Sequence, residues 1–358
     1  MKETKILAIN PGSTSTKIAV FQNKKCIFLK TIRHSAEELS QYETIYDQFH
    51  FRKKMILKEL GTENIGPGAV NVIIARGGVT KPLESGVYEI NQAMVDDLNS
   101  REYGMHASNL APLLAFDLAS KIPNTKAFIS DPVVTDELDA LARTAGHPLF
   151  ERRSIFHALN QKAVARAYAN SISKPYESLN LIVAHLGGGV SVGIHDHGSV
   201  VDVNNALDGE GPISPERSGS LPNGQLVDLC FTGDYTQSEI RKMICGNGGF
   251  VAHLGTSDGL EIQNRAEAGD EKCKHLLDVM AYQVAKTIGE MATVVAGKVD
   301  AILITGGLAY DKKMVAEISR RVSFLAPISV HPGEDEMEAM FSNAQRHLDG
   351  QEALKEYK

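Results

Sequence analysis

The stretch ILAINPGSTSTKIA at residues 6–19 decides how the rest of the chain is interpreted. An apolar run leads into Asn-Pro-Gly, then into Ser and Thr residues and Lys17, and a second apolar run follows. This pattern predicts a strand, a tight turn and a second strand. Backbone N–H groups, hydroxyls and one compact positive charge suit phosphate oxygens. The turn is not a P-loop, because G-x-x-x-x-G-K is absent, and an ordinary hairpin with a polar tip is the alternative.

A similar stretch, LIVAHLGGGVSVGI, occurs at residues 181–194. Aligning Asn10 with His185 places Gly12 on Gly187. Two such strand–turn–strand units, about one domain length apart, predict two similar domains that face each other across a cleft, each directing a turn at the same polyphosphate. A chance similarity between two hairpins is the alternative.

Length and composition indicate a globular protein. The 358 residues suggest roughly two domains, and 43% hydrophobic and 23% charged residues are ordinary for such a chain. The formal net charge of −7, without a Lys/Arg run, argues against a nucleic-acid or anionic-membrane partner. No apolar stretch approaches the ~18 residues that span a bilayer, and Lys2 and Glu3 leave no room for a signal peptide. The four cysteines lack C-x-x-C spacing, which favours free thiols and a cytoplasmic location.

Several polar residues follow predicted strands. Arg76 and two glycines come after the strand predicted at 70–75, Asp131 follows the strand at 127–130, and the glycine turn at 305–309 follows the strand at 301–304. Ligands of open α/β sheets bind at such strand ends. The alternatives are a surface ion pair for Arg76 and an ordinary Asp-Pro turn for Asp131.

Other candidate residues lie at predicted helix starts and in a long loop. His106 and His157 precede the helices expected from 110 and over 158–172, where they either face an anion or cap the helix. Arg217 lies in the apolar-poor loop 208–223, which is either a binding loop or a mobile surface loop. Spacing also predicts a surface helix over 44–60, a core helix over 274–297, and a helix from the acids at 334–336 to about 348.

Eight motifs together resemble the acetokinase family. In chain order they are NPGSTSTK at 10, ARGG at 75, YGMHASN at 103, FHALN at 156, HLGGGVS at 185, ERSG at 216, TGG at 305 and HPGEDE at 331. The resemblance covers essentially the whole chain. It implies the superfamily of sugar kinases, heat-shock chaperone ATPases and actin, an α/β fold with two duplicated actin-like (ribonuclease H-like) domains facing a nucleotide cleft. We expect the first domain at 1–155 with about 340–358, and the second at 156–339.

The resemblance also implies roles for individual residues. It assigns Asn10, Ser13, Ser15 and Lys17 to a first phosphate loop; His185, Gly187, Gly188 and Gly189 to a second; Gly306, Gly307 and Asp258 to the nucleotide; Asp131 and Glu336 to Mg²⁺; His106 and His157 to the active site; and Arg217 to the transferring phosphoryl group. Three positions depart from the family. Ile73 replaces its substrate arginine, so that Arg76 is the candidate for the substrate carboxylate; Leu260 replaces an arginine; and Gln161 replaces a histidine.

The implied activity is reversible transfer of the γ-phosphate of ATP to a short-chain fatty carboxylate, giving an acyl phosphate and ADP. Butyrate is the expected acid, with isobutyrate, propionate and acetate as alternatives. A carboxylate is ionised at neutral pH, which explains the lack of a general-base motif. The resemblance further implies a homo-oligomer. A hydroxyl-acceptor kinase with Asp131 as base, and an ATP-driven binding module of the chaperone or actin kind, are the rival interpretations.

Overall fold

The computed structural model describes residues 4–358, and the chain divides into two compact units. Unit 1 comprises residues up to Thr135 together with Asp335–Lys358, and unit 2 comprises Asp136–Glu334. The two boundaries predicted from the sequence, at 155 and 339, lie further along the chain. Residues 136–155 belong to unit 2 because they bond to its sheet: the Asp139 amide donates to the Val201 carbonyl (2.9 Å), and Arg152 pairs with Asp202.

Unit 1 is built on a seven-stranded sheet in the order β12-β5-β6-β4-β1-β2-β3. Its strands are β1 (Lys5–Pro11), β2 (Ser15–Gln22), β3 (Lys25–Arg33), β4 (Val72–Arg76), β5 (Val87–Glu89), β6 (Lys126–Ser130) and β12 (Leu354–Lys355). The first three strands form an antiparallel meander, and β4 and β6 continue the sheet parallel to β1.

Unit 2 repeats this arrangement in a five-stranded sheet ordered β11-β10-β7-β8-β9. Its strands are β7 (Asn180–Leu186), β8 (Val190–Asp196), β9 (Ser199–Val203), β10 (Ala301–Gly306) and β11 (Ile328–Pro332). Here too an antiparallel meander is extended by two parallel strands. Order and direction therefore match β3-β2-β1-β4-β6, and the duplicated α/β fold predicted from two similar hairpins is confirmed.

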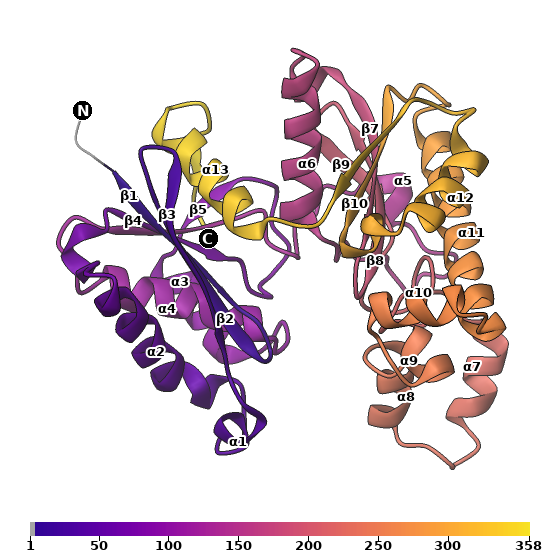
Figure 1. Ribbon diagram of the computed structural model, residues 1–358, viewed down its shortest axis with the longest axis horizontal. Helices are drawn as coiled ribbons and strands as arrows, with labels where there is room; N and C mark the ends of the chain where they lie inside the picture. Colours follow the sequence, from indigo (N-terminus) through magenta and orange to yellow (C-terminus); the bar gives the residue numbers. More distant parts are fainter. Residues whose placement is uncertain (1–3) are drawn as a thin grey trace. The chain divides into compact units, whose positions relative to one another are not determined.

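The helices of unit 1 cover both faces of its sheet. They are α1 (Ala36–Leu39), α2 (Phe49–Thr62), α3 (Gln92–Ser100), α4 (Leu110–Ala119) and α13 (Glu336–Leu348). Successive side chains of a strand point to opposite faces. Leu7 and Ile9 of β1 accordingly join the core on the α4 side, whereas Phe21 of β2 stacks on Phe341 of α13. Figure 1 shows α13, in yellow, beside the indigo strands from the other end of the chain.

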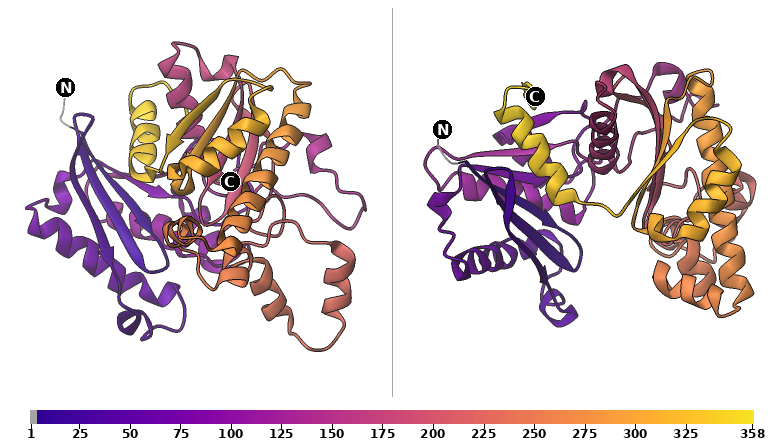
Figure 2. Two further views of the ribbon diagram at one scale, coloured as in Figure 1. Left: turned by 45° about the vertical axis from the view of Figure 1, so that its right-hand side comes forward. Right: turned by 45° about the horizontal axis from the view of Figure 1, so that its top comes forward.

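The helices of unit 2 also lie on both faces of the sheet (Figures 1 and 2). They are α5 (Ala140–Arg143), α6 (Ala158–Ser171), α7 (Asn223–Cys230), α8 (Gln237–Ile244), α9 (Gly249–Leu254), α10 (Gly259–Glu267), α11 (Glu271–Val294) and α12 (Lys312–Val322). Leu181 and Val183 of β7 pack toward α6, while Ile182 and Ala184 join the larger core with α11 and α12. No helix within residues 4–358 is long and apolar enough to cross a membrane.

The helix predicted over 44–60 differs from the observed one. The segment begins as a short 3-10 helix, Tyr46–Gln48, and α2 starts at Phe49. Helix α2 is more deeply buried than the sequence suggests, because Arg52, Ile56 and Leu60 are all buried.

Candidate functional site

Strand register brings the predicted residues of unit 1 to one edge of its sheet. Asn10 near the end of β1 pairs with Lys17 on β2. The parallel neighbour β4 ends at Arg76, which pairs with Ser130 at the end of β6, and Asp131 follows directly. Carboxyl ends of parallel strands are where ligands of α/β sheets bind.

Glu336 connects two of these strand ends. Its Oε1 oxygen pairs with Arg76 Nη1 at 3.0 Å, and its Oε2 oxygen accepts a hydrogen bond from Asn10 Nδ2. Glu336 is the first residue of α13, so its negative charge also interacts favourably with the positive end of the helix dipole. The amide oxygen of Asn10 is buried without a hydrogen-bond partner. Unsatisfied buried oxygens are rare in folded proteins, so this atom is a candidate contact for a donor brought by a ligand.

Asp131 is buried and held by three donors. Its Oδ1 oxygen accepts from Ser85 Oγ (2.5 Å) and the Gly86 amide (3.1 Å), and its Oδ2 oxygen accepts from Asn343 Nδ2 of α13 (3.0 Å). The residue has a φ of +39°, an uncommon conformation for a residue with a side chain. The surrounding donors therefore fix the carboxylate at the end of β6.

The turn predicted as the first phosphate loop is supported by Arg52, a residue that sequence reasoning missed. The Arg52 guanidinium is fully buried and donates to the carbonyls of Ser13 (3.0 Å) and Ser15 (2.9 Å) and to Thr16 Oγ1 (3.0 Å). Burial lowers the pKa of Arg52 to about 10, which still leaves it charged at neutral pH. A lone arginine in a helix usually extends into solvent, so the sequence carried no signal for this contact.

In unit 2, two predicted histidines lie face to face. The rings of His157, which precedes α6, and His185, in β7, stack with centroids 3.8 Å apart and planes inclined by 13°. His157 Nδ1 lies 2.8 Å from Ser191 Oγ. His185 Nδ1 lies 2.7 Å from Asn160 Oδ1, and its Nε2 lies 3.5 Å from Glu334 Oε2. The orientation of both rings is thus fixed by hydrogen bonds at Nδ1.

The turn predicted as the second phosphate loop, 187–189, lies against these rings. A Cβ atom on Gly187 would be 2.9 Å from His185 Nε2. One on Gly189 would be 3.7 Å from His157 Cε1 and 3.9 Å from Arg217 Cγ. A side chain at Gly187 would therefore be too close to His185, whereas a Cβ atom on Gly189 would make ordinary van der Waals contacts with His157 and Arg217.

The long loop is attached to this turn. The Gly188 carbonyl accepts hydrogen bonds from Ser214 Oγ (2.8 Å) and from the Glu216 amide (3.1 Å). Arg217 follows, with Nη1 3.2 Å from Glu216 Oε2. Its Nε atom is buried and has no hydrogen-bond partner. An unpaired buried N–H donor is costly, and a phosphoryl oxygen is a partner that would satisfy it. The loop is thus anchored and presents Arg217 beside the turn.

The third glycine turn, which contains Gly306 and Gly307, lies next to the turn of Asp258, the residue predicted on the adenosine side. Gly306 has a φ of +90°, and a Cβ atom there would be 2.3 Å from the Leu186 carbonyl oxygen, so only glycine fits. Gly307 follows in exposed backbone. Asp258 caps α10 by accepting from the amides of residues 260 and 261, and Gly259 lies against Leu308. The two turns are therefore neighbours.

The remaining predicted residues are less constrained. Ser13 is exposed, and Ser15 and Lys17 are half-buried. His106 caps a 3-10 helix, Ala107–Asn109, through Nδ1, which accepts from the Ser108 amide (3.2 Å). The capping alternative for His106 is therefore observed.

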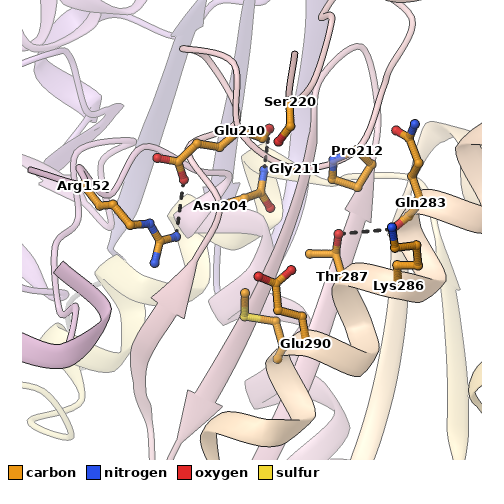
Figure 3. A pocket seen from close by; sticks show the side chains of 11 residues that line it. Arg152, Asn204, Glu210, Gly211, Pro212, Ser220, Gln283, Lys286, Thr287 and Glu290 are labelled. Carbon is orange, nitrogen blue, oxygen red and sulfur yellow. Dashed lines mark hydrogen bonds and ion pairs between the residues drawn. The ribbon is translucent and has the colours of Figure 1, made fainter. Parts of the chain in front are cut away.

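A pocket of about 570 Å³ lies elsewhere in unit 2, between α11 and the segment that leads to Arg217 (Figure 3). It is lined by Arg152, Asn204, Glu210, Gly211, Pro212, Ser220, Gln283, Lys286, Thr287, Glu290 and Met291. None of the individual candidate residues lines this pocket, but Glu210, Gly211, Pro212 and Ser220 of the predicted loop 208–223 do.

Comparison with known proteins decides the family. Residues 135–333 match the acetokinase family, and the chain is 54% identical over 354 residues to Butyrate kinase 2 of Clostridium acetobutylicum, covering 99% of both chains. The chain belongs to the acetokinase family. Another family relative is the Probable butyrate kinase of Clostridium botulinum, 52% identical over 99% of both chains. The crystal structure of Porphyromonas gingivalis acetate kinase superposes with a TM-score of 0.78 at 18% identity, covering 96% of this chain and 100% of that one, which supports the acetokinase fold.

Proposed function

We propose that this protein transfers the γ-phosphate of ATP reversibly to a short-chain fatty carboxylate, with butyrate as the preferred acid, giving butanoyl phosphate and ADP. Two relatives at 52–54% identity over 99% of the chain carry the name butyrate kinase. The observation that carries the proposal is the arrangement in unit 2, where Arg217, with its unpaired buried Nε, lies beside a glycine turn and two stacked histidines.

The chemistry requires charge stabilisation more than proton transfer. A carboxylate, with a reference pKa near about 4, is ionised at neutral pH and attacks phosphorus without a general base. The difficulty is to bring an anion to a polyanion and to hold charge on the oxygens of the transferring group. We assign that task to Arg217, His157 and His185, and assign the substrate carboxylate to Arg76.

We assign nucleotide binding to the three turns. Backbone amides of Gly187–Gly189 and of the loop around Ser13 and Ser15 are suited to phosphate oxygens, and Lys17 adds charge. Gly307 and Asp258, on neighbouring turns, are assigned to the adenosine side. The exposed side chain of Leu260, close in sequence to Asp258, and that of Tyr310, close in sequence to Gly307, add apolar surface.

The carboxylates fit a magnesium ion that arrives with the nucleotide. Within residues 4–358 no group of three or more His, Cys, Asp or Glu side chains could hold a metal, and Asp131 and Glu336 are engaged by protein donors. Mg²⁺ in such enzymes keeps several waters and uses one or two carboxylates with substrate phosphates. Asp131 and Glu336 would hold that ion, directly or through its waters, and the ion would neutralise phosphate charge.

The test is acyl phosphate formation, trapped as the hydroxamate, with ATP, Mg²⁺ and acids from acetate to valerate, including isobutyrate. We expect a maximum at four carbons, although one methylene is worth only about 1–3 kcal/mol in an apolar pocket. A maximum at another acid would replace butyrate and retain the carboxylate kinase. No product from any acid would discard the proposal and favour a hydroxyl acceptor, for which Asp131, already held by three protein donors, is an unfavourable base.

We also propose a homo-oligomer. Helix α7 contains no buried residue, and Val227 and Phe231 are 54% and 86% exposed. Apolar side chains left on the surface of one chain are typical of a protein interface. Light scattering coupled to size-exclusion chromatography tests this assembly.

A further inference from the structure

A chain of buried hydrogen bonds ends at His157. Tyr176 Oη lies 2.7 Å from His195 Nδ1, and His195 Nε2 lies 3.0 Å from Gln161 Oε1. Gln161 Nε2 lies 2.8 Å from Ser191 Oγ, which lies 2.8 Å from His157 Nδ1. Gln161, Ser191 and His195 are completely buried, so each polar atom depends on protein partners.

The Ser191 carbonyl fixes the direction of this chain. Amide oxygen and nitrogen are assigned from their partners, and a backbone carbonyl can only accept. The Gln161 side-chain atom 3.1 Å from the Ser191 carbonyl oxygen must therefore be the NH₂ nitrogen. Its second hydrogen is donated to Ser191 Oγ. The Gln161 oxygen then faces His195, which donates from Nε2 and accepts the Tyr176 hydroxyl at Nδ1.

The same reasoning shows which ring nitrogen of His157 carries the proton. Ser191 Oγ has two lone pairs: one accepts from Gln161, and the other faces the backbone amide of His157 at 3.5 Å. The hydroxyl hydrogen is left to donate to His157 Nδ1. A proton on Nδ1 would point at the Ser191 hydroxyl hydrogen, which is repulsive. The neutral ring therefore carries its proton on Nε2.

We propose that Gln161 and Ser191 are positioning residues that hold His157 in the Nε2-protonated form for donation to the transferring phosphoryl group. The inference rests on the proposed function for that last step. In the opposite tautomer, Nε2 would direct a lone pair at an anionic oxygen, which is repulsive. Stacking on His185 fixes the plane of the ring, and the hydrogen-bond chain fixes which nitrogen donates.

The tautomer is measured directly by ¹⁵N NMR of histidine-labelled protein. The His157 signal among the twelve histidines is identified by its loss in His157→Asn. We expect a bare Nδ1 and a protonated Nε2 in the wild type and in Ser191→Thr, which keeps the hydroxyl. In Ser191→Ala and Gln161→Met, which remove the donor or its orienting partner, protonation at Nδ1 appears. A protonated Nδ1 in the wild type, or an unchanged tautomer in both variants, overturns the proposal.

Kinetics test the purpose of this arrangement. Groups that orient metal-ligating histidines typically contribute about 10- to 100-fold. By analogy, kcat should fall by that factor in Ser191→Ala and Gln161→Met, with the KM for MgATP unchanged and recovery in Ser191→Thr. The matched control is Thr287→Val, which removes another buried hydroxyl of unit 2 and should alter neither tautomer nor kcat.

The two readouts separate the two proposals. A tautomer shift without loss of kcat overturns the role in transfer. Wild-type protein that shows the expected tautomer but forms no acyl phosphate refutes the proposed function and leaves the tautomer assignment intact.

Discussion

Arg217 is held beside Gly189 of the glycine turn and is not fully paired. Its loop is fixed to Gly188, Glu216 engages only Nη1, and Nε is buried without a partner. We therefore expect Arg217→Ala to lower kcat by about 10³-fold or more, the typical loss for an arginine that stabilises transition-state charge. The KM for MgATP should change little, and initial rates of acyl phosphate formation measure both.

The control for this substitution is Arg320→Ala, which removes another arginine of unit 2 that is paired with a glutamate. The Arg320 side chain is 65% exposed, so its loss should leave turnover unchanged. Near-normal turnover in Arg217→Ala would contradict the assignment.

His34 gives the folded state a predictable dependence on pH. The ring is 6% exposed, with Nε2 2.9 Å from Thr16 Oγ1. Burial and then the Arg52 charge lower its pKa below the ordinary 6.5. Unfolded chains therefore bind more protons, so the stabilisation is present above about pH 6.5 and is lost as the pH falls through the lower folded pKa.

Denaturant unfolding at several pH values tests this assignment. The free energy of unfolding should decline as the pH falls below about 6.5, and less steeply in His34→Gln than in the wild type. The exposed His275 provides the control, since His275→Gln should keep the wild-type slope. Equal slopes in wild type and His34→Gln would show that His34 is not the group responsible.

At the scale of elements, the short strand β12 secures unit 1 through Tyr357, two residues beyond it. Tyr357 is 2% exposed; its hydroxyl donates to Asp97 (2.6 Å), and its carbonyl accepts from Asn91 (2.7 Å). Burial raises the pKa of this phenol, which remains a donor. We expect Tyr357→Ala to cost about 3–5 kcal/mol, as for other buried aromatics, and Tyr357→Phe about 1–3 kcal/mol, for the lost bond to a carboxylate.

Hydrogen exchange localises that effect. Amides of β5, the neighbour of β12, should exchange faster in Tyr357→Ala while those of β7 do not change. Phe324→Ala, at an 80% exposed position, serves as the control. Unchanged exchange in β5 would mean that Tyr357 does not secure the sheet.

How well a feature could be predicted from the sequence depended on how far apart in the chain its interacting residues lie. Both hairpins were predicted, because apolar alternation and turn residues are local. The strand ends at Arg76 and Asp131 followed from the same patterns. The contacts of Arg52, the two bonds to the Gly188 carbonyl and the Asn10–Glu336–Arg76 cluster were not predicted, since they join residues that are far apart in the chain. Gln161 was visible only as a departure from the family, and its role required Ser191 and His195 as neighbours.

At the scale of the whole molecule, the two units share one sheet arrangement but place different residues at its equivalent corners. Arg76-Gly77-Gly78 at the end of β4 corresponds to Thr305-Gly306-Gly307 at the end of β10. With Asn10 aligned on His185, the pair of Ile9 and Ala75 matches the pair of Ala184 and Ile304, and Arg76 and Thr305 are the next residues. Unit 1 has exchanged a small polar side chain for a cation at this corner. The duplicated fold thus offers equivalent strand ends, which carry a cationic side chain in unit 1 and a small polar side chain in unit 2.

Nucleotide binding should therefore leave a pattern on both repeats. Hydrogen exchange of the intact protein is compared with and without MgADP. At about 100 times the dissociation constant, binding contributes about 2.7 kcal/mol, which slows exchange through openings that release the ligand by about 100-fold. We expect protection at residues 12–16, 186–190 and 306–310, with the edge strand β3 as an unaffected internal reference. Protection confined to the residues lining the pocket of Figure 3 would instead place the nucleotide there, and the three turns would lose their assignment.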